Sequence, residues 1–598
     1  MKLKWLILLA TLVFVVKAFP QGVINNGNVI KISSGGIIHI TGGGFTNTTI
    51  NGTDGAVNLS GSIYLDGDWT NNTTVGKLTL SGGTVYFDGS STQYITHNNY
   101  RTSFYNLIVN AGADVQVPAQ KEVEATNDLK NDGTFTLLST SDGTASLFYN
   151  KDCEENIVVK RYIESGGTTP IHYLSSPVYN ADIRSIIDAY NVYWYDEVVA
   201  STNLDIGWTR IISGNMVNAR GYVAPFNGAT SKLLTFTGKQ YNTSDITISI
   251  TYNTTSTPTA DGWNLIGNPY PVSINADLFL DDNKNIVGTV FFWDDGDGTI
   301  DRGADYAAWN KTGSTSTNAA DDVGNMGKPS GTIAIGQAFM VQALSSVSPT
   351  PGTDYVTFKN DYKTSNTTSQ FFIPDLAEIK RIKLSITSPL KDYNEIVIGF
   401  TSEATTGNDR LYDAPKLSGN QFISLYSFIE DDKYTIQGLP DLTNETVVPI
   451  GFFTSTEGLY SFKVPLMENF NFSTKVFLED LELKKSTEID TASIYQFYTK
   501  AGSINDRFLL HFIPNYSSIE HKTLKDYSKV YMMDHQLNII SNCHIKEIQI
   551  YDVSGKLIQQ VKELQKGSHQ IEILAKNGFY FVKIDSDSGS SVSTILVK

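Results

Sequence analysis

The 598-residue chain has only two cysteines and fewer basic than acidic side chains. Cys153 and Cys543 cannot build the disulfide framework of a small secreted domain. They lie in segments that we assign to different domains, so we favour two unpaired thiols over a disulfide. The 45 Lys and Arg against 62 Asp and Glu give a net charge of −17. Such an acidic surface repels nucleic acid and anionic lipid, so we expect neither as a partner.

The sequence also lacks the common catalytic patterns. There is no HExxH, no GxSxG elbow, no Walker-type loop and no GxGxxG, which argues against zinc proteases, serine hydrolases and nucleotide enzymes. Eight histidines are scattered with no short metal-ligand pair among them. We therefore name no catalytic residue and expect no enzyme. The histidines are His39, His97, His172, His511, His521, His535, His544 and His569.

Long hydrophobic runs are scarce, and the most apolar one is at the N-terminus. Lys2 and Lys4 precede an apolar stretch over 5–16, and Ala18 is small enough for a signal-peptidase site. The run is shorter than the roughly 20 residues that span a bilayer, which disfavours the alternative of a membrane anchor. Residues 1–18 are predicted to be a signal peptide, and no transmembrane segment is expected after its removal.

Glycine (48), Tyr (31) and Phe (30) are abundant, and long charged amphipathic runs are few, which is typical of an all-β protein. Residues 19–150 repeat about every twenty residues, with alternating apolar positions between Gly and Asn turns. This period predicts a β-solenoid whose coils bury their apolar faces on one another. The asparagine pairs 25–26, 71–72 and 98–99 are predicted to stack at its corners. The region is either a spacer or a platform that binds or cleaves sugars.

Two further sections are predicted to be β-sandwich-like, at residues 151–370 and 371–515. Short alternating strands such as GWNLIGNPYP (262–271) and RIKLSI (381–386) lie between Gly, Asn and Pro turns. Residues 181–190 are one of few helical candidates, because Ile183, Ile186 and Ile187 share one helical face. The run at 262–271 with the following INADLF resembles a recurrent module of secreted Bacteroidetes proteins, to which the resemblance assigns no activity.

Residues 520–598 form the most informative segment. IQIYDVSGKLIQQ from Ile548 reads as strand, turn and strand, NGFYFVKI follows at 577–584, and STILVK ends the chain. The segment resembles the type A C-terminal sorting domain of the type IX secretion system of Bacteroidetes, a small Ig-like β-sandwich. The resemblance implies export to the cell surface or the medium, with the outer-membrane secretion machinery and surface lipopolysaccharide as partners. The residues at the family's sorting-signal positions are Tyr551, Asp552, Gly555, Gly578, Tyr580 and Lys583.

One acidic loop suggests a metal site. The segment WDDGDGTIDRGAD at 293–305 alternates carboxylates with glycines, as a loop that wraps calcium must. It departs from the EF-hand pattern, because Thr299 stands at the fifth position and no glutamate closes the loop. A solvated hairpin turn is the alternative, and calcium is the one cofactor that we keep open. The predicted ligands are Asp294, Asp295, Asp297, Asp301 and Asp305.

Tryptophans are the other candidate ligand-binding residues, because an exposed indole ring can stack on a sugar. Trp208 and Trp263 follow glycines and precede alternating strands, so we expect both in a core. Trp309 is left open between core and sugar platform. The sequence therefore predicts an exported, adhesin-like or structural surface protein without enzymatic activity. A carbohydrate-binding protein or carbohydrate-active enzyme is the alternative.

Overall fold

The computed structural model describes most of the chain from residue 22 to residue 597. The predicted signal peptide and His521, His535 and Cys543 lie outside the described residues. The described ranges are 22–73, 78–98, 101–164, 170–187, 191–200, 207–228, 230–240, 245–254, 261–294, 305–317, 329–365, 379–417, 419–443, 446–471, 474–513, 528–533, 536–541, 544–565, 567–573, 576, 578–587 and 589–597.

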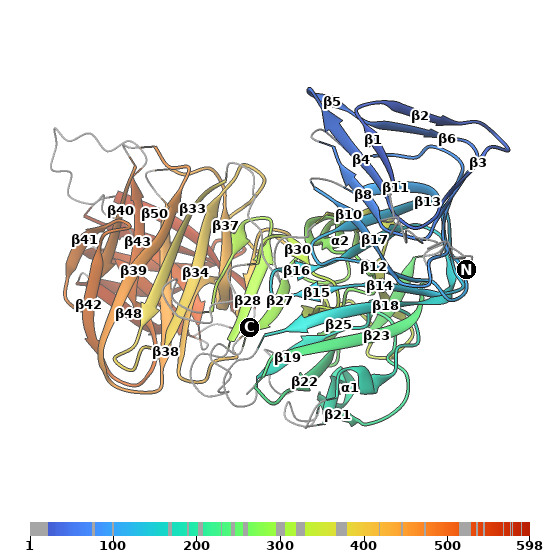
Figure 1. Cartoon of the computed structure of the whole chain (residues 1–598). Coiled ribbons are helices and arrows are strands. Elements are labelled where there is room, and N and C mark those ends of the chain that lie inside the picture. Colours follow the sequence, from blue (N-terminus) through green and yellow to red (C-terminus); the bar gives the residue numbers. More distant parts are fainter. Residues whose placement is uncertain are drawn as a thin grey trace, which may run out of the picture. The chain divides into compact units, whose positions relative to one another are not determined.

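The protein is nearly all β and divides into two compact units. Unit 1 comprises residues up to Thr140, Thr144–Lys160 and a short stretch from Gly238; unit 2 holds most of the remainder. In the described part of the chain, no helix is long and apolar enough to cross a membrane. Figure 1 shows the strands of both units in sequence colours.

Unit 1 is a parallel β-solenoid of about six turns, as the repeat predicted. Successive coils pair in register, so that Val23 lies opposite Phe45 and Phe45 opposite Trp69. One ladder contains β1 (Val23–Asn26), β4 (Phe45–Ile50), β8 (Trp69–Asn72), β10 (Thr92–His97), β12 (Asp114–Val117), β14 (Thr134–Leu137) and β18 (Cys153–Ile163). The other contains β3 (Ile37–Ile40), β7 (Ser62–Leu65), β9 (Thr84–Phe87), β11 (Thr102–Val109), β13 (Glu122–Asn131) and β17 (Ser146–Tyr149), and β2 (Val29–Ile32) pairs with β6 (Ala56–Leu59).

Asparagines stack inside the solenoid, which confirms part of the predicted ladder. Asn25 donates to Asn47 (Nδ2 to Oδ1, 2.9 Å), and Asn47 donates to Asn71 (3.2 Å). His97, not Asn98, occupies the next position of this row. Alternation decides this, because Ile95 and His97 of β10 point inward and Asn98 lies one residue beyond the strand.

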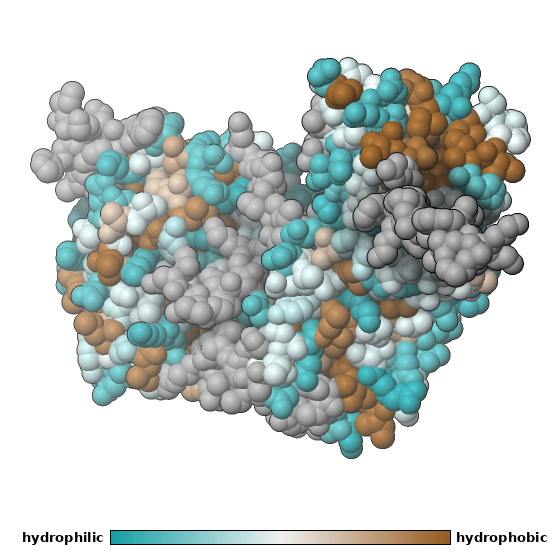
Figure 2. Space-filling model, in the orientation of Figure 1, coloured by the Kyte–Doolittle hydropathy of each residue, from teal (hydrophilic) through white to brown (hydrophobic). Residues whose placement is uncertain are grey.

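The solenoid exposes apolar side chains at its N-terminal coils. Figure 2 shows hydrophobic surface gathered there, at the upper right. Ile24, Val29 and Ile37 are each at least 60% exposed. These side chains lie on the outward faces of their strands, because they alternate with the more buried Asn25, Ile30 and Ile38.

The first part of unit 2 combines several small sheets and two short helices. A four-stranded sheet has the order β19 (Ile171–Leu174), β22 (Tyr222–Pro225), β20 (Val192–Tyr195) and β21 (Trp208–Ile211). A five-stranded sheet has the order β25 (Trp263–Gly267), β31 (Ala338–Gln342), β27 (Val290–Asp294), β28 (Asp305–Asn310) and β29 (Gly313–Ser314). The remaining elements are α1 (Glu197–Ala200), α2 (Ala276–Asp282), η1 (Ile183–Ser185), η4 (Asn360–Tyr362) and the pairs β24 (Ile246–Ile250) with β32 (Asp354–Phe358) and β26 (Ile274–Asn275) with β30 (Thr332–Ile333).

The helix expected at 181–190 is wrong over its described residues. Only a 3₁₀ turn forms at Ile183–Ser185, and the Asp182 side chain caps it by accepting from the Arg184 N–H. Branched isoleucines lose side-chain freedom in a helix, and burial of Ile183 and Ile186 in this turn satisfies the apolar pattern instead.

The second part of unit 2 is one large sheet that curls around its own core. Phe462 of β39 packs on Phe508 of β43 (ring centroids 5.0 Å apart), although these strands are not neighbours in the sheet. Val397, Ala414 and Ile436 of this part also pack with Trp263 and Phe291 of the first part, in one core cluster. The order is β41 (Lys485–Ile489), β40 (Lys475–Asp480), β43 (Gly502–Ile513), β38 (Val447–Thr454), β36 (Ile423–Ile429), β37 (Asp432–Leu439), β34 (Tyr393–Phe400), β33 (Lys380–Thr387), β39 (Gly458–Glu468) and β42 (Ile494–Thr499), with β35 (Ala414–Pro415) on β37.

The C-terminal segment forms two small antiparallel sheets around a common apolar core, a sandwich as predicted. Leu537 and Ile539 of one sheet pack with Ile548 and Ile550 of the other. One sheet has the order β44 (Ser528–Met533), β45 (Gln536–Ser541) and β48 (Gly567–Glu572). The other has the order β47 (Leu557–Leu564), β46 (Ile545–Asp552), β49 (Gly578–Ser586) and β50 (Gly589–Val597).

Candidate functional site

Unit 2 contains a cleft of about 1620 Å³. Strands β19, β20, β21 and β22 supply one part of its wall, and the β27–β28 hairpin supplies another. The segment 408–434 lines it as well. Ten aromatic side chains belong to the lining: Tyr173, Tyr193, Tyr195, Trp208, Trp263, Trp293, Tyr306, Tyr426, Tyr434 and Phe453.

The aromatic rings of the cleft pack on one another. Trp293 stacks on Tyr173 with ring centroids 5.9 Å apart, and Tyr306 meets Trp293 edge-on at 5.1 Å. Trp208 packs edge-on against Tyr195 at 4.8 Å. Trp208, Trp293 and Tyr306 are half-buried. Buried rings thus hold half-buried rings in fixed orientations, which is the arrangement of a preformed ligand platform.

Burial perturbs the phenols behind this platform. Tyr173 and Tyr306 share a hydrogen bond between their hydroxyls (2.7 Å). Loss of hydration raises the pKa of both hydroxyls, and it raises the pKa of Tyr195 to about 12. All three hydroxyls therefore stay neutral at physiological pH, and they give the cleft lining polar but uncharged groups.

Charged groups of both signs complete the lining. Arg410 donates to the carbonyl of Leu280 (3.0 Å). Loss of hydration lowers the pKa of its guanidinium. Lys433 places its ammonium 4.3 Å from the Tyr426 ring centroid. Asp431 and Asp432 lie at the turn before β37 and are exposed. The cleft thus has no single dominant charge sign.

The tryptophan predictions have mixed outcomes. Trp263 is 3% exposed and lies in a core, as expected, and Trp309 is 2% exposed. Trp309 also donates from Nε1 to Asp277 (2.9 Å), so it is a core residue. Trp208 is half-buried: it packs against the core cluster that contains Trp263, and its ring also lines the cleft. The alternation of Tyr193 and Tyr195 in the YWYDE run was the available signal for a shared aromatic face.

The predicted calcium loop is described only at its two ends. Asp294 and Asp305 are cross-strand partners at the base of the β27–β28 hairpin, while Asp295, Asp297 and Asp301 lie outside the described residues. Asp305 is buried, and backbone N–H groups of Tyr306 and Gly419 donate to its Oδ1, each at 2.8 Å. Asp294 accepts from Thr317. Calcium binding stays a prediction.

Few histidines take part in a polar cluster. Nε2 of His511 lies 3.0 Å from Glu479 Oε2, and both side chains are buried, so His511 is a packed residue on β43. No three His, Cys, Asp or Glu side chains gather as metal ligands within the described ranges. Cys153 is buried and unpaired, as expected, and burial raises the pKa of its thiol to about 12.

The residues predicted to form a sorting signal surround one hairpin and one strand. Asp552 Oδ1 accepts from the Ser554 and Lys556 N–H groups, which fixes the turn between β46 and β47. Gly555 in this turn has φ of +82°, a conformation that favours glycine. Gly578 begins β49 with φ of +154°, Tyr580 is buried in the core, and Lys583 pairs with Asp585 (2.9 Å).

An exposed aromatic face accompanies these residues. Tyr551 is the cross-strand partner of Phe581, which is 41% exposed, and Phe579 is 59% exposed on the same face of β49. Sequence reasoning missed both phenylalanines. The signal was their alternation with Tyr580 and Val582, which are buried.

Two family models and a solved structure are similar to this chain. The family model described as "Domain of unknown function (DUF8693)" matches residues 60–512, and that of "Domain of unknown function (DUF8694)" matches residues 518–597. No curated protein matches the sequence. A solved chain titled "Biofilm associated protein - BSP domain" aligns over 74% of this chain and 92% of its own length, with 9% identity and a TM-score of 0.15. Because the first family model covers residues 60–512, which is more than half of the chain, the chain belongs to the family described as "Domain of unknown function (DUF8693)".

Proposed function

We propose that this protein is an exported, adhesin-like surface protein without enzymatic activity, and that it binds a neutral glycan in the aromatic cleft of unit 2. The observation that carries the proposal is the preformed aromatic lining of that cleft. Sugar rings present apolar C–H faces that stack on indole and phenol rings, and their hydroxyls exchange hydrogen bonds with polar side chains.

Cleft size favours a chain of sugars over a single small molecule. Sites for small ligands usually enclose about 300–1,000 Å³, whereas this cleft measures about 1620 Å³. Arg410, Lys416 and Lys433 are balanced by Asp431 and Asp432 in its lining, so a polymer of one charge gains little there. The chain's net charge of −17 disfavours acidic polysaccharides further.

The C-terminal sandwich would act as a type IX sorting domain. Its support is the YDVSGK hairpin with its Asp552-capped turn, together with the resemblance of the segment to that family. In this role, Tyr551, Phe579 and Phe581 would present an aromatic sheet face to the outer-membrane machinery. The mature protein would then be secreted, or attached to the outer surface through lipopolysaccharide.

A glycan array with the purified full chain tests the cleft. Trp208→Ala and Trp293→Ala should each reduce binding at least tenfold, because each removes a half-buried ring of the platform. Trp194→Ala is the matched control: its ring packs under the Arg220 guanidinium (4.2 Å) and is not part of the cleft lining. Equal binding by all variants would contradict the proposal, and hydrolysis of a bound glycan would favour the enzyme alternative.

Calcium binding and export are tested by two separate experiments. The same array is repeated with a chelator, and a loss of binding would place the 294–305 loop at the ligand. Export is tested in a host with a type IX system by comparing the full chain with one that ends at residue 515. The shortened chain should stay in the periplasm; its arrival at the surface would contradict the sorting role.

A further inference from the structure

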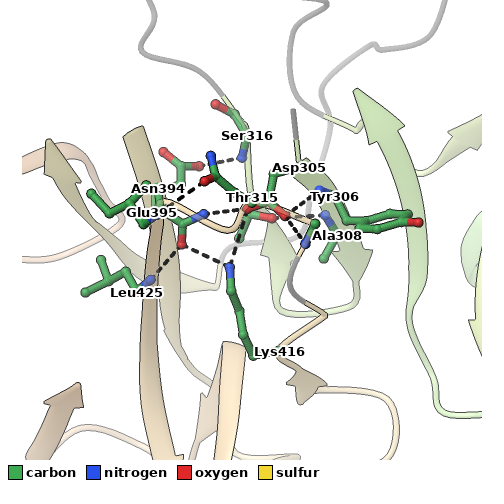
Figure 3. Close-up of polar contacts among 12 residues, drawn as sticks. Asp305, Tyr306, Ala308, Thr315, Ser316, Asn394, Glu395, Lys416 and Leu425 are labelled. Carbon is green, nitrogen blue, oxygen red and sulfur yellow. Dashed lines mark hydrogen bonds and ion pairs between the residues drawn. The ribbon is translucent and has the colours of Figure 1, made fainter. Parts of the chain in front are cut away.

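A lysine amine, an asparagine amide and an aspartate carboxylate meet inside unit 2 (Figure 3). Lys416 follows β35, Asn394 lies on β34 and Asp305 begins β28. Lys416 Nζ donates to Asn394 Oδ1 at 2.9 Å, and Asn394 Nδ2 donates to Asp305 Oδ2 at 2.7 Å. The same Asp305 oxygen lies 3.8 Å from Lys416 Nζ. The amine is therefore next to an amide carbonyl, and one carboxylate oxygen faces both nitrogens.

The Asn394 carbonyl is polarised by two donors. Besides Lys416, the backbone N–H of Leu425 donates to Oδ1 at 2.8 Å. A fixed backbone donor on a carbonyl oxygen stabilises the negative charge that develops there when a nucleophile attacks the carbon. This contact therefore favours addition to the Asn394 side chain, beyond merely holding it in place.

Asp305 is held so that only one of its oxygens faces the pair. The Tyr306 and Gly419 N–H groups both donate to Oδ1, at 2.8 Å each, and this leaves Oδ2 toward Asn394 and Lys416. Gly419 is required for this approach. A Cβ at that position would lie 2.9 Å from the Trp293 ring and 3.1 Å from Asp305.

Burial encloses all three reacting groups. The side chains of Lys416 and Asp305 are 4% and 2% exposed, and Asn394 is 3% exposed. The neutral amine is the nucleophile, and exclusion of water protects an amide product from hydrolysis.

We propose that Lys416 and Asn394 become joined by an intramolecular amide bond, formed within the folded chain with Asp305 as the catalytic carboxylate. The Nζ lone pair attacks Asn394 Cγ, and a new C–N bond forms. Asp305 accepts a proton from Nζ and delivers a proton to Nδ2. The bond from Cγ to Nδ2 then breaks and ammonia leaves. Asp305 ends as it began, and no oxidant or further reactant is needed.

Such a bond would brace the region around the cleft. It closes the chain between Asn394 and Lys416 into a loop, and Lys416 itself lines the cleft. A covalent link of this kind restricts the unfolded chain, as a disulfide does. In an exported protein with only two cysteines, it would be a covalent cross-link that reducing agents cannot cleave.

A second buried pair provides an internal control. Lys383 Nζ lies 2.6 Å from Glu395 Oε1, and both side chains are at most 3% exposed. The Tyr393 hydroxyl and the Ser316 N–H also donate to Glu395. An amide between Lys383 and Glu395 would release water, whereas the proposed bond releases ammonia. The mass of the product therefore identifies which pair has reacted.

Mass spectrometry of the denatured full chain tests the proposal. The wild type should be lighter than its sequence by one ammonia molecule, and a digest should contain one branched peptide that joins Asn394 to Lys416. Lys416→Arg and Asn394→Ala should have the full sequence mass, and Asp305→Ala should lower the joined fraction at least tenfold. Lys383→Arg should keep the loss of ammonia.

Two results would overturn the proposal. One is a wild-type chain of full sequence mass whose digest contains Asn394 and Lys416 in separate linear peptides. The other is a loss of ammonia without the branched peptide, which would indicate a cyclised asparagine elsewhere. The wild-type measurement decides the proposal even if a variant does not fold, since it needs no variant.

Discussion

The solenoid of unit 1 and the curled sheet of unit 2 bury polar groups in different ways. In the solenoid, Asn25, Asn47 and Asn71 repeat one contact from coil to coil. In unit 2, the buried polar contacts follow no such repeat, and the bond from Asn394 to Asp305 joins positions 89 residues apart. A coil needs to suit only its neighbours, whereas a contact in unit 2 depends on how distant segments meet. Substitution of a buried polar residue should therefore lower stability moderately in unit 1 and strongly in unit 2.

The largest effect is expected from the buried ion pair of unit 2. Asp480 is fully buried and accepts from Arg507 Nε (3.1 Å), Arg507 Nη2 (2.9 Å) and the Tyr495 hydroxyl (3.0 Å). Asp480→Ala removes the buried carboxylate and leaves the guanidinium only the exposed Glu482 (2.6 Å) as an ionic partner, so it should cost about 3 kcal/mol of unfolding free energy. Denaturant unfolding of the full chain measures it. A cost below about 1 kcal/mol would mean that the pair is as replaceable as a surface contact.

Acid should weaken the solenoid through one histidine. Burial, assisted by Lys121, lowers the pKa of His97 to about 4 from the usual 6.5. Between these values the unfolded chain binds a proton that the folded chain does not, so stability falls as the pH drops from 6.5 to 4 and then levels off. The loss should approach about 3 kcal/mol.

His97→Asn provides the control for this pH effect, because it continues the asparagine row without a titrating group. Hydrogen exchange of the solenoid strands at pH 7 and pH 4 should then show less acid loss in the variant than in the wild type. An equal acid loss in both proteins would assign the effect to other groups.

A smaller cost is expected inside the asparagine row. Asn47→Ala removes the acceptor of Asn25 and the donors to Asn71 and to the Gly55 carbonyl (2.8 Å). Three polar partners each lose one hydrogen bond, so the cost should be about 1–3 kcal/mol. Asn72→Ala, on the outer face of the same ladder, should change stability by less than about 0.5 kcal/mol. If both variants lost the same unfolding free energy, the buried asparagine row would contribute no more than an asparagine on the outer face.

The smallest effect tests the surface of the same strand that carries Asp480. Lys475 Nζ forms an ion pair with Glu488 Oε1 (2.5 Å), and both side chains are at least 36% exposed. Solvent and salt screen such pairs, so Lys475→Ala should cost no more than about 1 kcal/mol. A larger cost, measured in the same denaturant series, would remove the contrast between buried and exposed pairs.

Regular elements were accessible from the sequence because their signals are local. The twenty-residue period indicated the solenoid, and the Ser554–Gly555 turn signal located the hairpin of the C-terminal sandwich. The helix expected at 181–190 failed, while α2 formed at 276–282 behind an Asn275 cap that accepts from the Leu278 N–H. In α2 the cap and the helical spacing of the buried Ala276, Phe279 and Leu280 agree, whereas burial in a 3₁₀ turn outweighed the apolar period at 181–187.

The candidate site was much less accessible. Asp305 was predicted as a calcium ligand, yet its described contacts are with Tyr306, Gly419, Asn394 and Lys416. Trp208 was assigned to a core on its sequence neighbours alone. Apart from Tyr306, the partners of Asp305 lie 89 or more positions away in the sequence, so they could not be read locally. Trp208 contacts Tyr195 on the neighbouring strand and Tyr173 on another strand of the same sheet, and this pairing was not read from the sequence.

The sequence by itself determined the all-β class, the stacked coils of unit 1 and the sandwich at the C-terminus. These follow from side-chain alternation and turn residues, which act over a few positions. Only the tertiary structure decided that aromatic rings of β20, β21, β27 and β28 share one cleft, and that Lys416 reaches Asn394 beside Asp305. Those contacts depend on how whole sheets pack, and packing is set by the sum of many distant apolar contacts that no short pattern encodes.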